Sequence, residues 1–434
     1  MNGQRAAGVV AQVALQVSAV ALAFVLGFVL VLIFGYDPFE VYSVLFNGAL
    51  GGLENVAWSL QNTTPLIFTG LAVALAFRAG LFNIGAEGQL VAGAFAAAVV
   101  GWAVPRLAGQ DLSGSPFWNA TWYPVGAGVV LATLLALAWT AVPHRGRPAQ
   151  RLAAVRRVAG VVAALVAILY LLIPRASGLF LWVGDVAVVP LALVAAAVAG
   201  ALWALIPALL RSRLGVSEVI TTIMFNFLAT LLASYLLTTT AFKEPGAVPQ
   251  TPAVAPRAQL AELARFAPQS CHRDLDATQL NTGFVLALVV AILVAYFLWR
   301  TTLGFELRAV GANAEAARAQ GISVGGCVVL TMLLSGALAG LGGAEQVLGV
   351  HHHFVKDFWV GLGFTGIAVA LVGQNHPGGV VLAAILFGAL QNGAVEIDMM
   401  TLFPRELILV LQALIIFLVA SGPMLQEILL RRRR

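Results

Sequence analysis

The few residues of this chain that could do chemistry lie mostly inside long apolar segments. Glu87 follows Asn83 by four positions, within the apolar run of residues 82–104. On a helix this spacing places both side chains on one face, where an amide and a carboxylate can form a hydrogen bond. A charge inside a membrane costs about 3 kcal/mol even on lenient scales. The pair is therefore expected either to lock helices together or to form part of a gate, and the sequence leaves both interpretations open.

Polar side chains recur every four residues along a second apolar run, residues 217–241. Because an α-helix has 3.6 residues per turn, this spacing drifts by about 40° per step and gives a spiral stripe. A single Ser or Thr in such a helix usually bonds its own backbone or holds helices together. The whole stripe instead predicts a face that lines a translocation path, and we assign Gln391 and Asn392 of the run 378–394 to the same path. The stripe consists of Thr222, Asn226, Thr230, Ser234 and Thr238.

The remaining polar residues predict neither catalysis nor a metal site. His351–His353 are consecutive, and three neighbouring side chains of a regular element cannot all face one metal ion. The two cysteines, Cys271 and Cys327, form no CxxC spacing. A phosphate-binding P-loop needs the pattern GxxxxGK[ST]. The two lysines, Lys243 and Lys356, are each followed by an acidic residue. We therefore expect no cofactor in this chain.

The composition identifies the elements that position these residues as membrane helices. Hydrophobic residues make up 60% of the 434 positions and charged residues only 10%, whereas soluble domains carry about 25% charged residues. A membrane-spanning helix needs about 20 apolar residues. We predict an all-α polytopic membrane protein with about 12 transmembrane helices in one domain, residues 1–434. The apolar runs cover residues 9–35, 57–77, 82–104, 123–142, 158–174, 186–210, 217–241, 282–300, 324–345, 361–374, 378–394 and 405–422. The shortness of the run 361–374 leaves a re-entrant or broken helix within 361–394 open.

The basic residues predict the orientation. If the N-terminus is cytoplasmic and the runs alternate, the cytoplasmic segments hold 16 of the 24 Lys and Arg residues. The reverse orientation would place the basic cluster at 145–157 and the tail Arg431–Arg434 outside, against the positive-inside rule. We therefore expect both termini in the cytoplasm and residues 242–281 in an extracytoplasmic loop. The net charge of +5 is explained by this bias and does not predict nucleic-acid binding.

Residues 300–323 form a polar loop on the cytoplasmic side of this topology. We expect a turn at 311–313, then a two-turn helix over 314–320 that Gly321 ends with a positive φ. The helix has an acidic residue near its start and a basic one near its end, as the helix dipole favours. Because its surface is mostly alanine, it should bind lipid poorly and should insert instead into a groove of another protein. The residues that we assign to this contact are Gly311, Asn313, Glu315, Ala316, Ala317, Arg318 and Gly321.

Several segments resemble one family of transporters. The EAA step at 315–317, followed by Gly321, resembles the coupling loop by which ABC-transporter permeases dock on their ATPase. Residues 77–89 (FRAGLFNIGAEGQ) and 215–226 (GVSEVITTIMFN) are similar to segments of the branched-chain amino acid, simple-sugar and nucleoside permeases. Residues 361–378 most resemble the nucleoside-type subgroup. The family usually has about ten spans or fewer, so residues 123–174 are predicted to be an inserted helical pair.

This resemblance implies a type II ABC importer-like fold and a transport subunit rather than an enzyme. Its partners would be an ABC ATPase subunit, a second permease that is expected to be a different chain, and an extracytoplasmic substrate-binding protein. It would lie in a bacterial inner membrane. The implied solute is first a nucleoside, then a simple sugar such as ribose, then a branched-chain amino acid. An ion-coupled secondary transporter is the alternative class, which would need an acid–base pair near the bilayer midplane and no docking loop.

Overall fold

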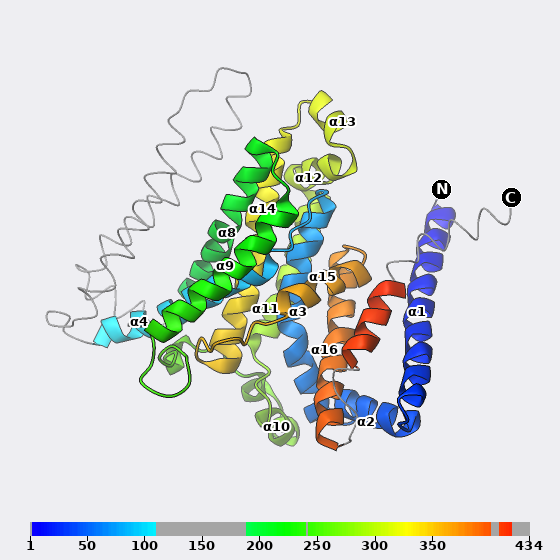
Figure 1. Cartoon of the computed structure of the whole chain (residues 1–434), viewed down its shortest axis with the longest axis vertical. Helices are drawn as coiled ribbons and strands as arrows, with labels where there is room; N and C mark the ends of the chain where they lie inside the picture. The colour runs from blue at the N-terminus through cyan, green and yellow to red at the C-terminus, as the bar shows by residue number, and fades with distance from the viewer. Residues whose placement is uncertain (1, 110–187, 240–241, 401–407, 419–434) are drawn as a thin grey trace.

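The computed structural model describes residues 2–109, 188–239, 242–400 and 408–418, and the predicted inserted pair at 123–174 lies outside these ranges. Within them the regular structure is helical, with two isolated β-bridges between loop residues. Seven described helices are long and apolar enough to cross a membrane. Three shorter apolar helices accompany them, at Ser18–Ile33, Leu362–Val372 and Ile408–Leu418. The prediction of an all-α polytopic fold is confirmed (Figure 1).

The helices follow the predicted apolar runs closely. The helices α11 and α14 begin where the predicted runs 282–300 and 324–345 begin, because Asn281 and Ser323 cap them by accepting hydrogen bonds from the backbone N–H groups of Gly283 and Gly326. The described helices are α1 (Asn2–Ile33), α2 (Pro38–Leu50), α3 (Leu53–Arg78), α4 (Ala86–Gly109), α8 (Val188–Leu214), α9 (Glu218–Thr239), η3 (Pro256–Ala258), η4 (Leu263–Phe266), α10 (Gln269–Asp276), α11 (Thr282–Arg300), α12 (Thr302–Ala312), α13 (Ala314–Ala319), α14 (Val324–Glu345), the π-helix η5 (Gln346–His351), α15 (Leu362–Val372) and α16 (Pro377–Met400).

Besides the short helices of the loop 242–281, two helices lie where the sequence predicted none. The carboxylate of Asp37 accepts a hydrogen bond from the N–H of Phe39 and caps α2, which begins with Pro38 in the first turn, where proline fits best. The hydroxyl of Thr301 caps α12 in the same way. Both helices are shorter than a membrane span and of mixed polarity, so apolar periodicity alone did not reveal them.

Small residues bring the helices at the centre of the bundle into backbone contact. Gly336 and Gly340 lie one turn apart on α14. A Cβ atom at Gly336 would collide with the carbonyl oxygen of Gly200 in α8, and one at Gly340 with that of Ala196. Gly93 of α4 contacts Gly340 from another side. Small residues four positions apart are the usual means by which membrane helices approach closely, so α4, α8 and α14 form one tightly packed unit.

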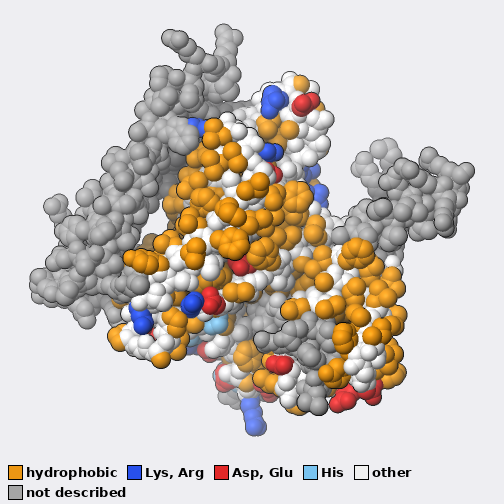
Figure 2. All heavy atoms as spheres, viewed as in Figure 1, with side chains coloured by type: hydrophobic (Ala, Val, Ile, Leu, Met, Phe, Trp, Pro, Cys, Tyr) orange, Lys and Arg blue, Asp and Glu red, His pale blue; other side chains and the backbone are white. Residues whose placement is uncertain are grey.

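The two ends of the bundle carry different structures. The helix α11 has 19 residues and is about 28 Å long, so the loop 242–281 before it and α12–α13 after it lie at opposite ends (Figure 1). On the face in Figure 2, hydrophobic side chains cover most of the middle, and most charged side chains lie toward the upper and lower ends. This distribution fits a protein that crosses a bilayer.

We expect Gly340→Val to prevent folding. The new side chain would meet the backbone of α8 at Ala196 and Gly200, and such overpacking costs about 3 kcal/mol or more. The measurement is the amount of protein in the membrane and its thermal midpoint in detergent. Gly325→Ala is the matched control on the same helix, because the nearest atom to its new Cβ would be 3.7 Å away. Equal stability of the two variants would contradict the proposed close packing.

Candidate functional site

The helix α15 crosses only part of the bundle and begins near its middle. It has 11 residues, which gives about 16 Å, roughly half of a hydrocarbon core of about 30 Å. Just after its C-terminal end, the carbonyl oxygens of Gln374 and Asn375 accept hydrogen bonds from the side chain of Arg78, at the end of α3. Its N-terminal end at Gly361 therefore lies well inside the bundle, and the run 361–374 forms only a short helix. A re-entrant or broken helix in the membrane stays a prediction.

Glu87 lies at this N-terminal end of α15. The N–H of Gly361 donates a hydrogen bond of 3.2 Å to the Oε2 atom of Glu87, and the N–H groups of Gly363 and Phe364 also stabilise the carboxylate. The positive end of the helix dipole favours a negative charge at this point. The carboxylate lies in the first turn of α4, because α4 begins at Ala86. The arrangement can hold a buried negative charge without a basic side chain.

Asn83 lies in the turn before α4, so the predicted pairing with Glu87 on one helix face is wrong. Its amide instead forms two reciprocal hydrogen bonds with the amide of Gln89, of 2.9 and 3.1 Å. It also donates to the hydroxyl of Ser335 in α14, which in turn donates to the carbonyl oxygen of Ala72 in α3. All of these side chains are buried. This chain of hydrogen bonds ties α3, the start of α4 and α14 together.

Asn226 of α9 closes the same turn from the other side. Its Oδ1 atom accepts a hydrogen bond of 2.9 Å from the N–H of Gly88, and its Nδ2 atom donates one of 2.9 Å to the carbonyl oxygen of Ile84. The hydroxyl of Thr222 donates to its own backbone at Glu218. Both side chains are buried. At this end of the stripe, the polar groups hold helices together.

The other residues assigned to a translocation path differ in exposure. Thr230 and Ser234 of α9 are half-buried and Thr238 is exposed, so this half of the stripe reaches the surface of the chain. On α16, Gln391 is half-buried, while the amide of Asn392 donates to the carbonyl oxygens of Gly48 in α2 and Asn55 in α3. A role of these residues in translocation stays a prediction.

The loop between α11 and α14 consists of two short helices. The side chain of Asn313 caps α13 by accepting hydrogen bonds from the N–H groups of Glu315 and Ala316. Gly321 has a φ of +82°, as predicted. The predicted turn at 311–313 is wrong at its first two positions, because α12 ends at Ala312 and its last turn contains Gly311. Gly311 packs there against the backbone of Arg78, which leaves no room for a Cβ atom.

The short helix α13 (Ala314–Ala319) presents only part of its surface to the outside. Glu315, Ala316 and Arg318 are exposed. Ala317 is buried in a small cluster with Val310 and Cys327, so the expectation that it contacts another protein is not supported by its position. Apart from Glu315 and Arg318, whose charges cancel, the exposed face carries only alanine side chains. Its dimensions and position at one end of the bundle suit a contact with a further protein.

The loop 242–281 packs on the opposite end of the bundle. Its backbone donates hydrogen bonds from Thr251 and Val254 to the carbonyl oxygens of Phe354 and His352, in the segment that leads to α15. At its end, the amide of Asn281 donates to the Oε1 atom of Glu345, at 3.1 Å. Glu345 lies at the C-terminal end of α14 and is buried. The loop is therefore an ordered cap that is attached to α14.

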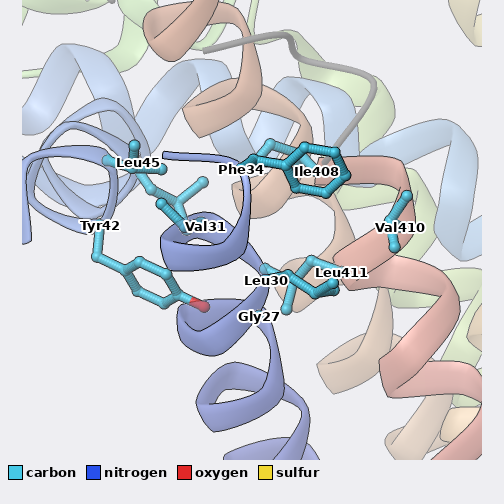
Figure 3. Close-up of a pocket in the computed structure, with 10 residues that line it drawn as sticks. Gly27, Leu30, Val31, Phe34, Tyr42, Leu45, Ile408, Val410 and Leu411 are labelled. Carbon is cyan, nitrogen blue, oxygen red and sulfur yellow. The ribbon is translucent and has the colours of Figure 1, made fainter. Parts of the chain in front are cut away.

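A small apolar pocket lies away from these residues, between α1, α2 and the helix Ile408–Leu418 (Figure 3). Its volume of about 20 Å³ could hold a water molecule but not a nutrient molecule. Tyr42 is among its lining residues, and apart from the Tyr42 hydroxyl the side chains of the lining are apolar. Among the described residues, we found no group of three or more His, Cys, Asp and Glu side chains that could hold a metal ion.

Comparison with known proteins points to transport. Residues 153–420 match the family described as the permease component of the branched-chain amino acid transport system. The chain is 32% identical to the guanosine ABC transporter permease protein NupP of Bacillus subtilis (strain 168), over 93% of this chain and 92% of that protein. It is 31% identical to the nucleoside ABC transporter permease protein NupB of Lactococcus lactis, over 93% and 89%. It is 32% identical to the glucose ABC transporter permease protein TsgB13 of Haloferax volcanii, over 93% and 86%. No solved structure matches the chain.

The contacts of Asn226 allow a test of its role. We expect Asn226→Leu to lower the amount of folded protein, because it leaves the N–H of Gly88 and the carbonyl oxygen of Ile84 without partners, at about 1–3 kcal/mol each. Thr230→Val is the matched control, since it removes a polar group of the same stripe. The measurement is the thermal midpoint in detergent together with uptake. A fully stable Asn226→Leu that has lost uptake would show instead that the amide acts in translocation.

Proposed function

Because the chain belongs to the family of permease components of the branched-chain amino acid transport system, and is thus a membrane-spanning permease subunit of an ABC importer, we propose that its solute is a nucleoside. The observation that carries this proposal is the similarity to guanosine and nucleoside permeases along nearly the whole chain. The resemblance of residues 361–378 to the nucleoside-type subgroup supports it. The similarity to a glucose permease makes a sugar the competing solute.

The helix α13 is proposed to dock on a separate ATPase subunit. It is the outermost helix at its end of the bundle in Figure 1, and its exposed side carries Ala316 between one acidic and one basic residue. Small side chains allow close approach of another protein, and the two charges can set its register. ATP and its Mg²⁺ would bind to that subunit.

The helix α14 is proposed to carry the movement of α13 across the membrane. The helix α13 ends at its C-cap Gln320, and only three residues later Ser323 caps the first turn of α14. In the middle of α14, Ser335 accepts a hydrogen bond from Asn83, in the turn before α4. At the far end of α14, Glu345 accepts a hydrogen bond from Asn281 and so holds the cap 242–281. A displacement of α13 would therefore reach both the centre and the opposite surface through one helix.

The opposite end of the bundle is proposed to face outward and to meet a substrate-binding protein. The cap 242–281 covers this end, and its prolines and hydrogen bonds to residues 352–356 give it a fixed shape. A second permease subunit, expected to be a different chain, would complete the path beside the exposed half of the α9 stripe. We place the assembly in a bacterial inner membrane with both termini in the cytoplasm.

Uptake of labelled solutes tests the function. Cells that lack the gene should regain uptake of a labelled nucleoside, such as guanosine, when the gene is restored, and not of glucose, ribose or leucine. Restored uptake of glucose, ribose or leucine alone would refute the nucleoside assignment.

A variant on the exposed side of α13 tests the coupling. Ala316→Asp should leave the amount of folded protein unchanged, because the side chain is exposed, and should abolish both uptake and co-purification of the ATPase subunit. A desolvated carboxylate without a partner in the contact costs several kcal/mol. Ala316→Ser is the matched control and should transport normally. Normal transport by Ala316→Asp would mean that this face makes no essential contact.

The orientation can be tested by labelling single cysteines. In a Cys271→Ser background, Phe266→Cys on the cap should react with an impermeant maleimide in intact spheroplasts, because Phe266 is exposed. Ala319→Cys, which is exposed on α13, should react only after the membrane is permeabilised. The native Cys327 is buried and should contribute little signal. The reverse pattern would invert the topology.

A further inference from the structure

A group of basic and aromatic side chains meets at the end of the bundle that carries α12 and α13. The guanidinium of Arg78 lies 5.7 Å from the centre of the Trp299 ring, and the rings of Trp299 and His376 are 4.8 Å apart. Arg308, on α12, is close enough to Arg78 for their positive charges to repel each other. We call Arg78, Trp299, Arg308, Asn375 and His376 the basic junction.

The junction contains two positive charges without a carboxylate. Among the described residues, neither Arg78 nor Arg308 forms an ion pair, and Arg78 is bound only by backbone carbonyl oxygens and by the Trp299 ring. His376 adds no further charge near neutral pH, because partial burial and the neighbouring Arg78 hold the pKa of His376 below its usual value. Two like charges near each other are unfavourable, so the junction is complementary to an anion.

Two buried polar atoms of the junction lack hydrogen-bond partners. They are the Nε atom of Arg308, which is a donor, and the Oδ1 atom of Asn375, which is an acceptor. Both atoms are closed to solvent, so a ligand could meet only the remaining polar atoms of these half-buried residues.

The surface beside the junction is apolar and exposed. Tyr296 and Trp299 lie on the last turns of α11, and Leu303 and Phe305 on α12; all four side chains are exposed. Trp and Tyr gather where membranes meet water. The basic junction therefore continues into an exposed apolar surface along α11 that could contact acyl chains.

We propose that the basic junction binds the headgroup of an anionic phospholipid, for which phosphatidylglycerol is the test lipid. Its phosphate would accept from the terminal guanidinium nitrogens of Arg308, while its chains lie along α11. The ammonium of phosphatidylethanolamine would instead meet two arginines. Basic pockets between membrane helices on the cytoplasmic side bind anionic headgroups by this chemistry. The proposal extends beyond the transported solute and does not depend on its identity.

An acidic surface of the ATPase subunit is the other anion that could reach this end of the bundle. The exposed apolar side chains favour the lipid, because a docking protein surface would have to cover Leu303, Phe305 and Tyr296 as well as the two arginines. The two possibilities give different results in the experiment below.

Thermal unfolding of the purified full chain in detergent tests the site. Added phosphatidylglycerol should raise the thermal midpoint more than phosphatidylcholine, phosphatidylethanolamine or inorganic phosphate does. Arg308→Gln should weaken the apparent affinity for phosphatidylglycerol about fivefold. Its midpoint in phosphatidylcholine should not fall, because the lost Nε atom has no protein partner.

Arg300→Gln is the matched control. It removes the same charge from an exposed residue at the end of α11 that forms no hydrogen bond or ion pair in the described part of the chain, so it should keep the response to phosphatidylglycerol. Mass spectrometry should find less co-purified phosphatidylglycerol on Arg308→Gln than on the unmodified chain or on Arg300→Gln. An unchanged response of Arg308→Gln would overturn the proposal, as would an equal effect of inorganic phosphate. Loss of the ATPase subunit from Arg308→Gln with an unchanged lipid response would assign the junction to protein docking.

Discussion

Inside a bilayer no water is available to pair with backbone N–H and C=O groups, so each interruption of a helix must be closed by the protein itself. This chain has two such interruptions that meet, the turn at 79–85 before α4 and the segment 352–361 before α15. In the turn at 79–85, Asn226 donates a hydrogen bond to the carbonyl oxygen of Ile84, and Asn83 is bonded to the side chain of Gln89. At the second interruption, Glu87 accepts a hydrogen bond from the N–H of Gly361 at the start of α15. The positions of Asn83, Asn226 and Glu87 are best explained by this requirement.

The same requirement links the centre to both ends of the molecule. The hydroxyl of Ser335 joins the closed turn to α14, and α14 is continuous from the cap of its first turn to Glu345. The segment that leads to α15 is held by the cap 242–281, and the far end of α15 is held by Arg78. A rearrangement at either end would therefore have to change the hydrogen bonds at the centre, which is the behaviour that alternating access demands.

The sequence was most informative where the signal is local. The ends of α11 and α14 follow from capping residues next to apolar runs, and the positive φ of Gly321 follows from a glycine after a short helix. It failed where the partner is distant. Asn83 was paired with Glu87 because they are four residues apart, but its partners are Gln89 and Ser335, the second 252 residues away. Nothing near Asn83 reveals Ser335, whereas Gln89 belongs to the same motif and could have been considered. Ala317 was similarly assigned to an outer face because burial inside so short a loop leaves no periodic pattern.

The contact among Gly93, Gly200, Gly336 and Gly340 has a consequence for how such a sequence can change over time. Each glycine touches the backbone of a neighbouring helix, so no single exchange to a larger residue can be absorbed by moving one side chain aside. A lineage could leave this arrangement only by shifting a whole helix, which would displace the turn at 79–85 and the start of α15 as well. These four positions are therefore bound to one another as a set, although they lie on three helices and span 248 positions of the sequence, from Gly93 to Gly340.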